Sequence, residues 1–143
     1  MKQTDFYKNY CELITYYQCI EVHLKGLCAL LLADEERGWF DRLEDYESDP
    51  LGKMIQEIQS LQVKKNCVLF SPEEFEALNT IRQSRNLWVH QCFVGYSHVT
   101  FRNGIVRAPY GEMLAADLNE AIYWDQKITE IGHTLFQQHN GEQ

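Results

Sequence analysis

The fold class is decided by residues 5–33, which read DFYKNYCELITYYQCIEVHLKGLCALLLA. From Phe6 to Leu31 the large apolar residues recur at alternating spacings of four and three. A β-strand repeats every two residues, whereas a helix that packs against other helices repeats in this way. Proline is absent from the stretch, so we expect one helix from Asp5 to Ala33, about 43 Å long at 1.5 Å per residue. A helix of this length is typical of a helix bundle.

A charged connector and a short helix are expected next. Residues 34–49 are rich in acidic side chains, and Trp39 and Phe40 are expected to anchor this connector onto the core. Asp49 and Pro50 suit the cap and the first turn of a helix. The buried face of that helix is expected to carry Leu51, Met54, Ile58 and Leu61.

The helix that begins at Ser71 has the best-marked start in the chain. Ser71-Pro72-Glu73-Glu74 combines an N-cap serine, a proline at the first helical position and a glutamate that closes a capping box. We expect this helix to end near residues 93–95. Its apolar face is expected to carry Phe75, Leu78, Ile81, Trp88, Val89 and Cys92.

A β-hairpin is expected at about residues 97–110. Val99–Arg102 and Ile105–Ala108 flank Asn103-Gly104, a strong signal for a two-residue turn. Pairing across this turn would place Phe101 opposite Val106 and Val99 opposite Ala108.

A last helix is expected over residues 113–137, with residues 139–143 frayed. The order of elements predicts an all-α fold, a four-helix bundle with a small β-hairpin between the third and fourth main helices. The whole chain, residues 1–143, is expected to form a single helical domain.

The composition is that of one ordinary globular domain, with 143 residues, 45% hydrophobic and 24% charged. The longest apolar run, residues 27–33, is far shorter than the roughly 20 residues that span a membrane. The first residues carry no apolar stretch of the kind found in secretion signals. The five cysteines form no Cys-x-x-Cys pair, so we expect reduced thiols and a cytoplasmic protein.

Charge is distributed unevenly along the chain, whose net charge is −8. Residues 1–52 carry a net charge of −6 and residues 108–143 a net charge of −5, whereas residues 53–107 carry +3. An acidic chain binds nucleic acid poorly in general, because that affinity comes from neutralising phosphates. Contacts with phosphate are therefore expected from the middle of the chain.

Metal sites receive little support from the sequence. Some four-helix bundles hold two irons with paired Glu-x-x-His motifs, but Glu130 and His133 form one such motif without a second copy. Glu21 and His23 have the wrong spacing, and no group of cysteines and histidines has the spacing of a zinc site. We expect no metal and no cofactor.

Polar residues gather in residues 82–90, RQSRNLWVH, on the second half of the capped helix. Asn86 and His90 are four residues apart, so their side chains share a helix face and can touch. Arg85 lies at the border between this polar strip and the apolar strip. A guanidinium there is costly to bury unless it faces a carboxylate, an anion or a groove.

These residues resemble the R-x4–6-H signature of HEPN domains, with Arg85, a polar Asn86 and His90 late in the third main helix. The resemblance in helix order covers nearly the whole chain. HEPN domains are helical bundles, and many are metal-independent ribonucleases of toxin–antitoxin, abortive-infection and CRISPR defence systems.

The resemblance implies a metal-independent endoribonuclease that acts as a homodimer on RNA and is controlled by an antitoxin protein. Arg85, Asn86 and His90 would be catalytic, with two Arg/His pairs facing each other across the dimer axis. The products would end in 2′,3′-cyclic phosphate. The basic side chains expected to bind RNA are Arg82, Arg102, Arg107, Lys64 and Lys65.

Two alternatives stay open at this point. Arg85 could pair with a carboxylate such as Glu12 or Glu21 on the first helix, and His90 could cap carbonyls at its helix end. The protein would then be a non-catalytic interaction or nucleotide-binding module that partners a nucleotidyltransferase or another antitoxin.

Overall fold

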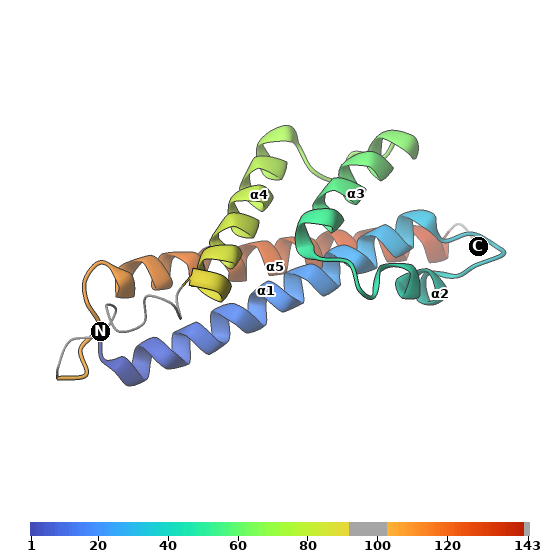
Figure 1. Ribbon diagram of the computed structural model, residues 1–143. Coiled ribbons are helices and arrows are strands. Elements are labelled where there is room, and N and C mark those ends of the chain that lie inside the picture. The colour runs from blue at the N-terminus through green and yellow to red at the C-terminus, as the bar shows by residue number, and fades with distance from the viewer. Residues whose placement is uncertain (92–102, 142–143) are drawn as a thin grey trace.

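The computed structural model describes residues 1–91 and 103–141, and within these ranges it contains five α-helices and no β-strand (Figure 1). The predicted all-α class is therefore confirmed. In chain order the elements are α1 (Gln3–Leu32), α2 (Trp39–Leu43), the 3-10 helix η1 (Glu44–Tyr46), α3 (Leu51–Lys64), α4 (Pro72–Asn86), the π-helix η2 (Leu87–Gln91) and α5 (Tyr110–Gly141).

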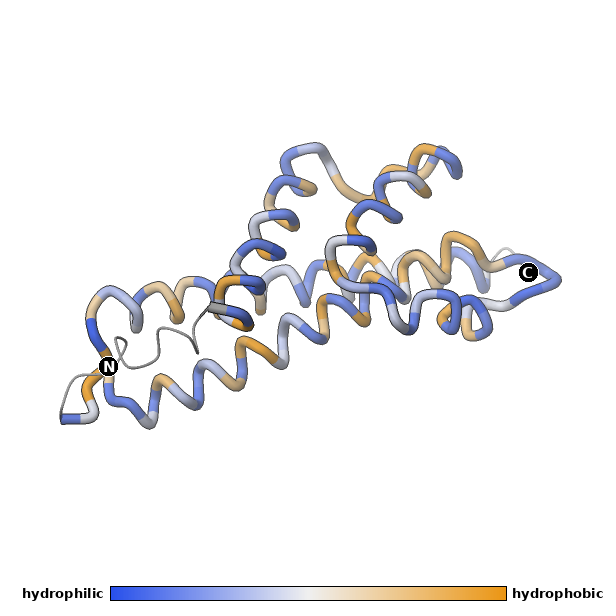
Figure 2. Tube along the Cα trace, in the orientation of Figure 1, coloured by the Kyte–Doolittle hydropathy of each residue, from blue (hydrophilic) through white to orange (hydrophobic). Residues whose placement is uncertain are grey.

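The two longest helices, α1 and α5, run parallel and side by side along the molecule (Figure 1). Hydrophobic residues recur between hydrophilic ones along both helices (Figure 2). Each helix therefore has one hydrophobic face to bury. The buried residues of α1 include Phe6, Leu13, Tyr17, Ile20, Leu24 and Leu27, and those of α5 include Leu114, Leu118, Ala121, Trp124 and Ile128.

Helices α3 and α4 lie across this pair and complete the core (Figure 1). The segment between them contributes Phe70, whose ring packs against Phe75 of α4 at 5.5 Å and Trp124 of α5 at 6.4 Å between centroids. Both helices run obliquely to α1 and α5 in Figure 1. The finer prediction of a four-helix bundle with a hairpin is not confirmed.

The connector after α1 is anchored differently from the prediction. Phe40 is 71% exposed and Trp39 is 36% exposed, whereas Tyr46 of η1 is 7% exposed and packs into the core. The expected cap of α3 was also wrong, because Pro50 occupies the N-cap position without a side-chain hydrogen bond. The Asp49 carboxylate instead pairs with the Lys53 ammonium at 3.0 Å.

The second half of the expected hairpin pairs with the start of the chain. Gly104 has a φ of +68°, as a tight turn requires, and its carbonyl accepts a hydrogen bond from the Gln3 amide at 2.6 Å. The Val106 amide donates to the Met1 carbonyl at 2.8 Å. The other predicted strand, Val99–Arg102, lies outside the described residues, and with it the predicted pairings of Phe101 and Val99.

Helix α5 is longer than expected, since it starts at Tyr110 and continues to Gly141. Residues 139–141, which were expected to be frayed, are helical. In the described part of the chain, no helix combines the length and the apolar character needed to cross a membrane.

Candidate functional site

The start of α4 is held by the capping box that its sequence predicts. The Glu74 amide donates to the Ser71 hydroxyl at 3.1 Å, and the Ser71 amide donates to the Glu74 carboxylate at 3.0 Å. The same carboxylate forms an ion pair with Lys127 of α5. The Lys127 ammonium and the Ser71 amide together hold the pKa of Glu74 below its usual range. These contacts fix the first residue of α4. They therefore also fix the position along the helix of the motif residues near its C-terminal end.

The far end of α4 is anchored by Trp88, which is 3% exposed. Its ring packs against Phe6 and Tyr10 of α1, with centroids 6.2 and 6.4 Å away. Its indole Nε1 donates to the Asp117 carboxylate of α5 at 2.7 Å, and the Tyr10 hydroxyl donates to the Trp88 carbonyl at 3.0 Å. One residue thus ties the end of this helix to both α1 and α5.

The helix changes type at this anchor. Residues Leu87–Gln91 form the π-helix η2, in which hydrogen bonds join residues five apart. In an α-helix, Arg85 and His90 would point about 140° apart, because each residue turns the helix by about 100°. The wider π turn reduces the rotation between them. Short π-helical segments are rare in proteins, but those that do occur are frequently found at functional sites.

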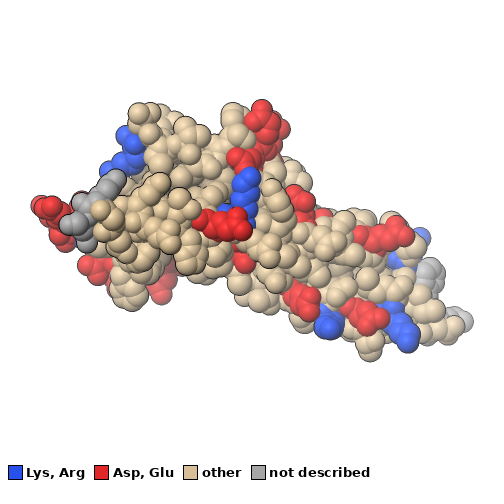
Figure 3. All heavy atoms as spheres, turned by 180° about the vertical axis from the view of Figure 1, so that it is seen from behind, with Lys and Arg blue, Asp and Glu red and all other residues tan. Residues whose placement is uncertain are grey.

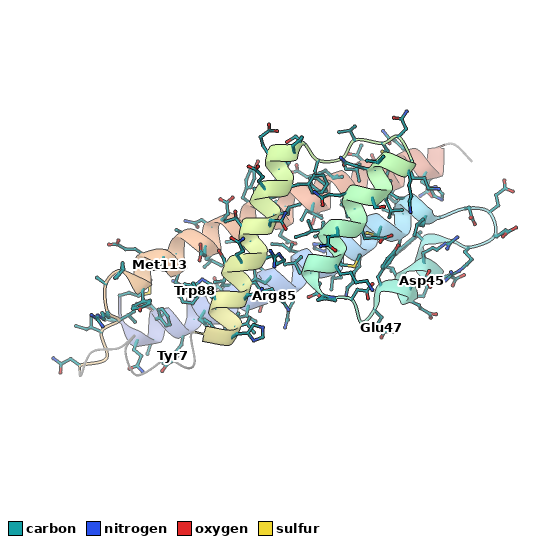
Figure 4. All side chains as sticks on the ribbon, turned by 45° about the horizontal axis from the view of Figure 1, so that its top comes forward. Tyr7, Asp45, Glu47, Arg85, Trp88 and Met113 are labelled. Atoms are coloured by element: carbon teal, nitrogen blue, oxygen red, sulfur yellow. The ribbon has the colours of Figure 1, made fainter. Side chains whose placement is uncertain are left out.

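The three residues of the R-x4–6-H motif lie where α4 passes into η2, with Arg85 and Asn86 at the end of α4 and His90 in η2. Figure 4 shows Arg85 on the last turn of α4, near Trp88. Arg85 and Asn86 are half-buried, whereas His90 is exposed. Asn86 and His90 were expected to be able to touch, but no hydrogen bond joins them among the described residues.

Arg85 makes no ion pair with any carboxylate of the described residues. Glu21, one expected partner, pairs with Lys25 of its own helix at 3.5 Å. Glu12, the other, lines a shallow groove along α1 and forms no ion pair in the described ranges. Within the described residues, the half-buried Arg85 guanidinium therefore has no carboxylate partner.

Two of the basic residues that were expected to bind RNA, Lys64 and Lys65, lie far along the chain from Arg85. Lys64 and Lys65 are exposed at the end of α3, close in sequence to the start of α4, whereas Arg85 is on its last turn. Arg85 lies 13 positions after Pro72, which corresponds to about 20 Å of helix. On the face seen in Figure 3, basic side chains lie in small separate groups among acidic ones.

Arg82 lies about one helix turn before Arg85 on α4, and Arg107 lies in the segment before α5. The Arg82 side chain crosses the first turn of α3, where its Cδ would be 2.8 Å from a Cβ at Gly52, so the glycine makes room for it. Arg107 is exposed three residues before α5. Arg102 lies outside the described residues.

A partly buried polar pair was missed by sequence reasoning. His23 Nδ1 of α1 lies 2.6 Å from the Asp125 carboxylate of α5, and the Thr129 hydroxyl lies 3.4 Å from the same nitrogen. His23 had been considered only as a metal ligand beside Glu21. No local signal predicts this pair, because its members are 102 positions apart.

Metal ligands are dispersed in the described ranges, where no three His, Cys, Asp or Glu side chains form a group that could hold an ion. Glu130 and His133, the single Glu-x-x-His motif, are both exposed on α5.

In comparisons with known proteins, no family model, no curated protein and no solved structure matches the chain.

Proposed function

We propose that the protein is a metal-independent endoribonuclease of HEPN type that works as a homodimer, a toxin or defence effector held in check by an antitoxin. The proposal includes the four-helix-bundle topology of that family, with a hairpin before the last helix. The observation that carries it is the half-buried Arg85, which has no carboxylate partner among the described residues and precedes the π turn that bears His90.

The chemistry of RNA cleavage suits these two side chains. RNA carries its own nucleophile, the 2′-hydroxyl, so the enzyme must remove one proton, supply another and stabilise charge on the phosphate. Histidine exchanges protons near neutral pH. Arginine binds two phosphate oxygens through its planar fork. In this proposal His90 transfers the proton and Arg85 holds the scissile phosphate.

A dimer follows from the need for both an acid and a base. One histidine cannot easily serve both sides of an in-line displacement, so two copies of His90 would face each other across a two-fold axis. The exposure of His90 at the end of η2 is compatible with this arrangement. The interface would be formed by the same surface of both copies.

A second candidate is favoured by the position of the lysines. Lys64 and Lys65 are separated from Arg85 by most of α4, so the described residues provide no continuous basic track for RNA. The protein would then be a non-catalytic HEPN-like module that binds nucleotide or a partner such as a nucleotidyltransferase. Arg85 would still bind an anion, but no RNA would be consumed.

The two candidates are separated by comparing activity with stability. We expect the purified protein to cleave RNA in the presence of EDTA and to leave 2′,3′-cyclic phosphate ends. His90→Ala and Arg85→Ala should each lower the cleavage rate by about 10²–10⁴. Their melting temperatures should change little, because exposed and half-buried polar substitutions typically change stability by about 0.5 kcal/mol.

The matched control is His133→Ala, which removes another exposed histidine and should change neither property. The ribonuclease proposal fails if the wild-type protein, free of any partner, leaves tRNA, mRNA and single-stranded oligonucleotides intact. It fails equally if His90→Ala cleaves these RNAs at the wild-type rate.

A further inference from the structure

An apolar groove lies at the other end of α1, away from Arg85 and His90. It has a volume of about 330 Å³ and is formed by α1, α2 and α5. This volume is at the lower end of the range that binds small molecules. The residues that line it are Val22, His23, Gly26, Leu27, Leu30, Trp39, Leu43, Ile128, Thr129, Gly132, His133 and Phe136.

Two glycines and two aromatic rings shape the groove. A Cβ at Gly26 would meet no atom within 4 Å, and one at Gly132 would contact only the Leu27 side chain, at 3.6 Å. The rings of Trp39 and Phe136 meet edge to face, with centroids 6.1 Å apart and an interplanar angle of 89°. These rings explain why Trp39 stays partly exposed, since it forms a wall of the groove and not a core anchor.

Two histidines line the groove, and of these His23 has a ring held by a hydrogen-bond partner, whereas His133 is exposed on α5. An ionised carboxylate can only accept hydrogen bonds, so the 2.6 Å contact with Asp125 places the proton of a neutral ring on Nδ1. Nε2 is then an acceptor, and it has no partner among the described residues. The Thr129 hydroxyl donates to the Asp125 backbone carbonyl at 2.8 Å, so it does not compete for Nε2.

We propose that this groove binds a small, uncharged aromatic molecule that donates one hydrogen bond to His23 Nε2. Aromatic walls favour a flat ring, and the net charge of −6 on residues 1–52 disfavours an anion. A protein partner fits less well, because the 12 lining residues are about half of the 20–30 that one side of a standard interface contributes. The site is independent of the proposed ribonuclease activity.

The test uses two probes that differ at one position, where a methyl group replaces the hydroxyl hydrogen. 2-Naphthol can donate to Nε2, whereas 2-methoxynaphthalene has the same rings and no donor. By isothermal titration calorimetry at neutral pH, we expect one 2-naphthol per chain, bound about fivefold more tightly than the ether, which is the ratio that one net hydrogen bond gives. Absence of binding by both probes overturns the proposal.

Three variants connect the binding to the groove. Gly26→Leu fills the groove and should weaken both probes at least tenfold while the melting temperature stays the same or rises, because leucine favours a helix more than glycine does. His23→Phe should abolish the preference for 2-naphthol. Gln18→Leu adds the same side chain to an exposed position of α1 outside the groove and should bind both probes as the wild type does.

Other outcomes contradict the proposal. Wild-type affinity in Gly26→Leu would place the probes elsewhere on the protein. A change of molar mass in light scattering on Gly26→Leu, with no probe binding to the wild type, would assign the groove to a contact between two copies of the chain.

Discussion

Removing the hydroxyl of Tyr17 is expected to stabilise the protein. Tyr17 is 2% exposed in the middle of α1, and its hydroxyl is buried with no hydrogen-bond partner in the described part of the chain. Burial, with a smaller contribution from the negative charge of Asp117, raises the pKa of Tyr17 far above its ordinary value of 10.0. On folding, the hydroxyl therefore loses its hydrogen bonds to water and forms none with the described residues.

The size of the effect follows from the cost of such a hydroxyl. A buried hydroxyl without a partner costs about 1–3 kcal/mol in proteins. Tyr17→Phe keeps the ring and removes this cost, so we expect the free energy of unfolding to rise by about 1 kcal/mol. For a domain of this size that corresponds to an increase in Tm of about 4 °C.

The matched control is Tyr10→Phe, also on α1. Its hydroxyl donates to the Trp88 carbonyl at 3.0 Å, so its removal should lower the free energy of unfolding by about 1 kcal/mol. Both variants would be unfolded in urea, followed by circular dichroism, with the slopes compared with that of the wild type. If Tyr17→Phe is destabilised as much as Tyr10→Phe, the Tyr17 hydroxyl has a partner and the reasoning is refuted.

Three further predictions follow from the helix ends, the buried thiol and the proposed dimer. Ser71→Ala should lower the free energy of unfolding by about 1 kcal/mol in urea titrations, because it removes the N-cap of α4; an unchanged midpoint would contradict this role. Burial, with Glu57 and Asp49, raises the pKa of Cys28 from 9.0 to about 12. Between these values the unfolded chain loses the thiol proton and the folded chain keeps it, so stability should fall above about pH 9, and less steeply in Cys28→Ala; equal slopes would exclude the thiol as the cause. Light scattering at micromolar concentrations should give the mass of a dimer, and a monomer would remove the composite site.

Local features of the fold could be predicted because their causes lie within a few residues. The three-and-four spacing of apolar residues in α1 depends on the geometry of successive helix turns. The capping box at Ser71 depends on residues within a single turn. The failures occurred where two apolar candidates competed for one place. Trp39 and Phe40 are larger apolar signals than Tyr46, yet Tyr46 packs into the core, whereas Trp39 lines the groove between α1, α2 and α5 and Phe40 is exposed.

The sequence predicted which residues form the candidate site, but it did not predict the π-helical turn that sets their relative directions. Arg85, Asn86 and His90 belong to one segment, so their proximity needs no tertiary information. The π turn between them coincides with the place where Trp88 is tied to Tyr10 and Asp117, and these residues lie on two other helices. A period of 3.6 residues assumed throughout the segment could not have predicted this change.

The sequence by itself determined the helical class, the boundaries of α1 and the start of α4, because hydrophobic spacing and capping act through contacts between near neighbours. Tertiary structure alone decided which distant residues meet. His23 and Asp125 face each other only because α1 and α5 pack parallel to each other in one register. The same register brings Met1 to Val106, and the oblique path of α3 and α4 separates Lys64 from Arg85. Such pairings depend on how whole helices pack, and no spacing within either helix encodes them.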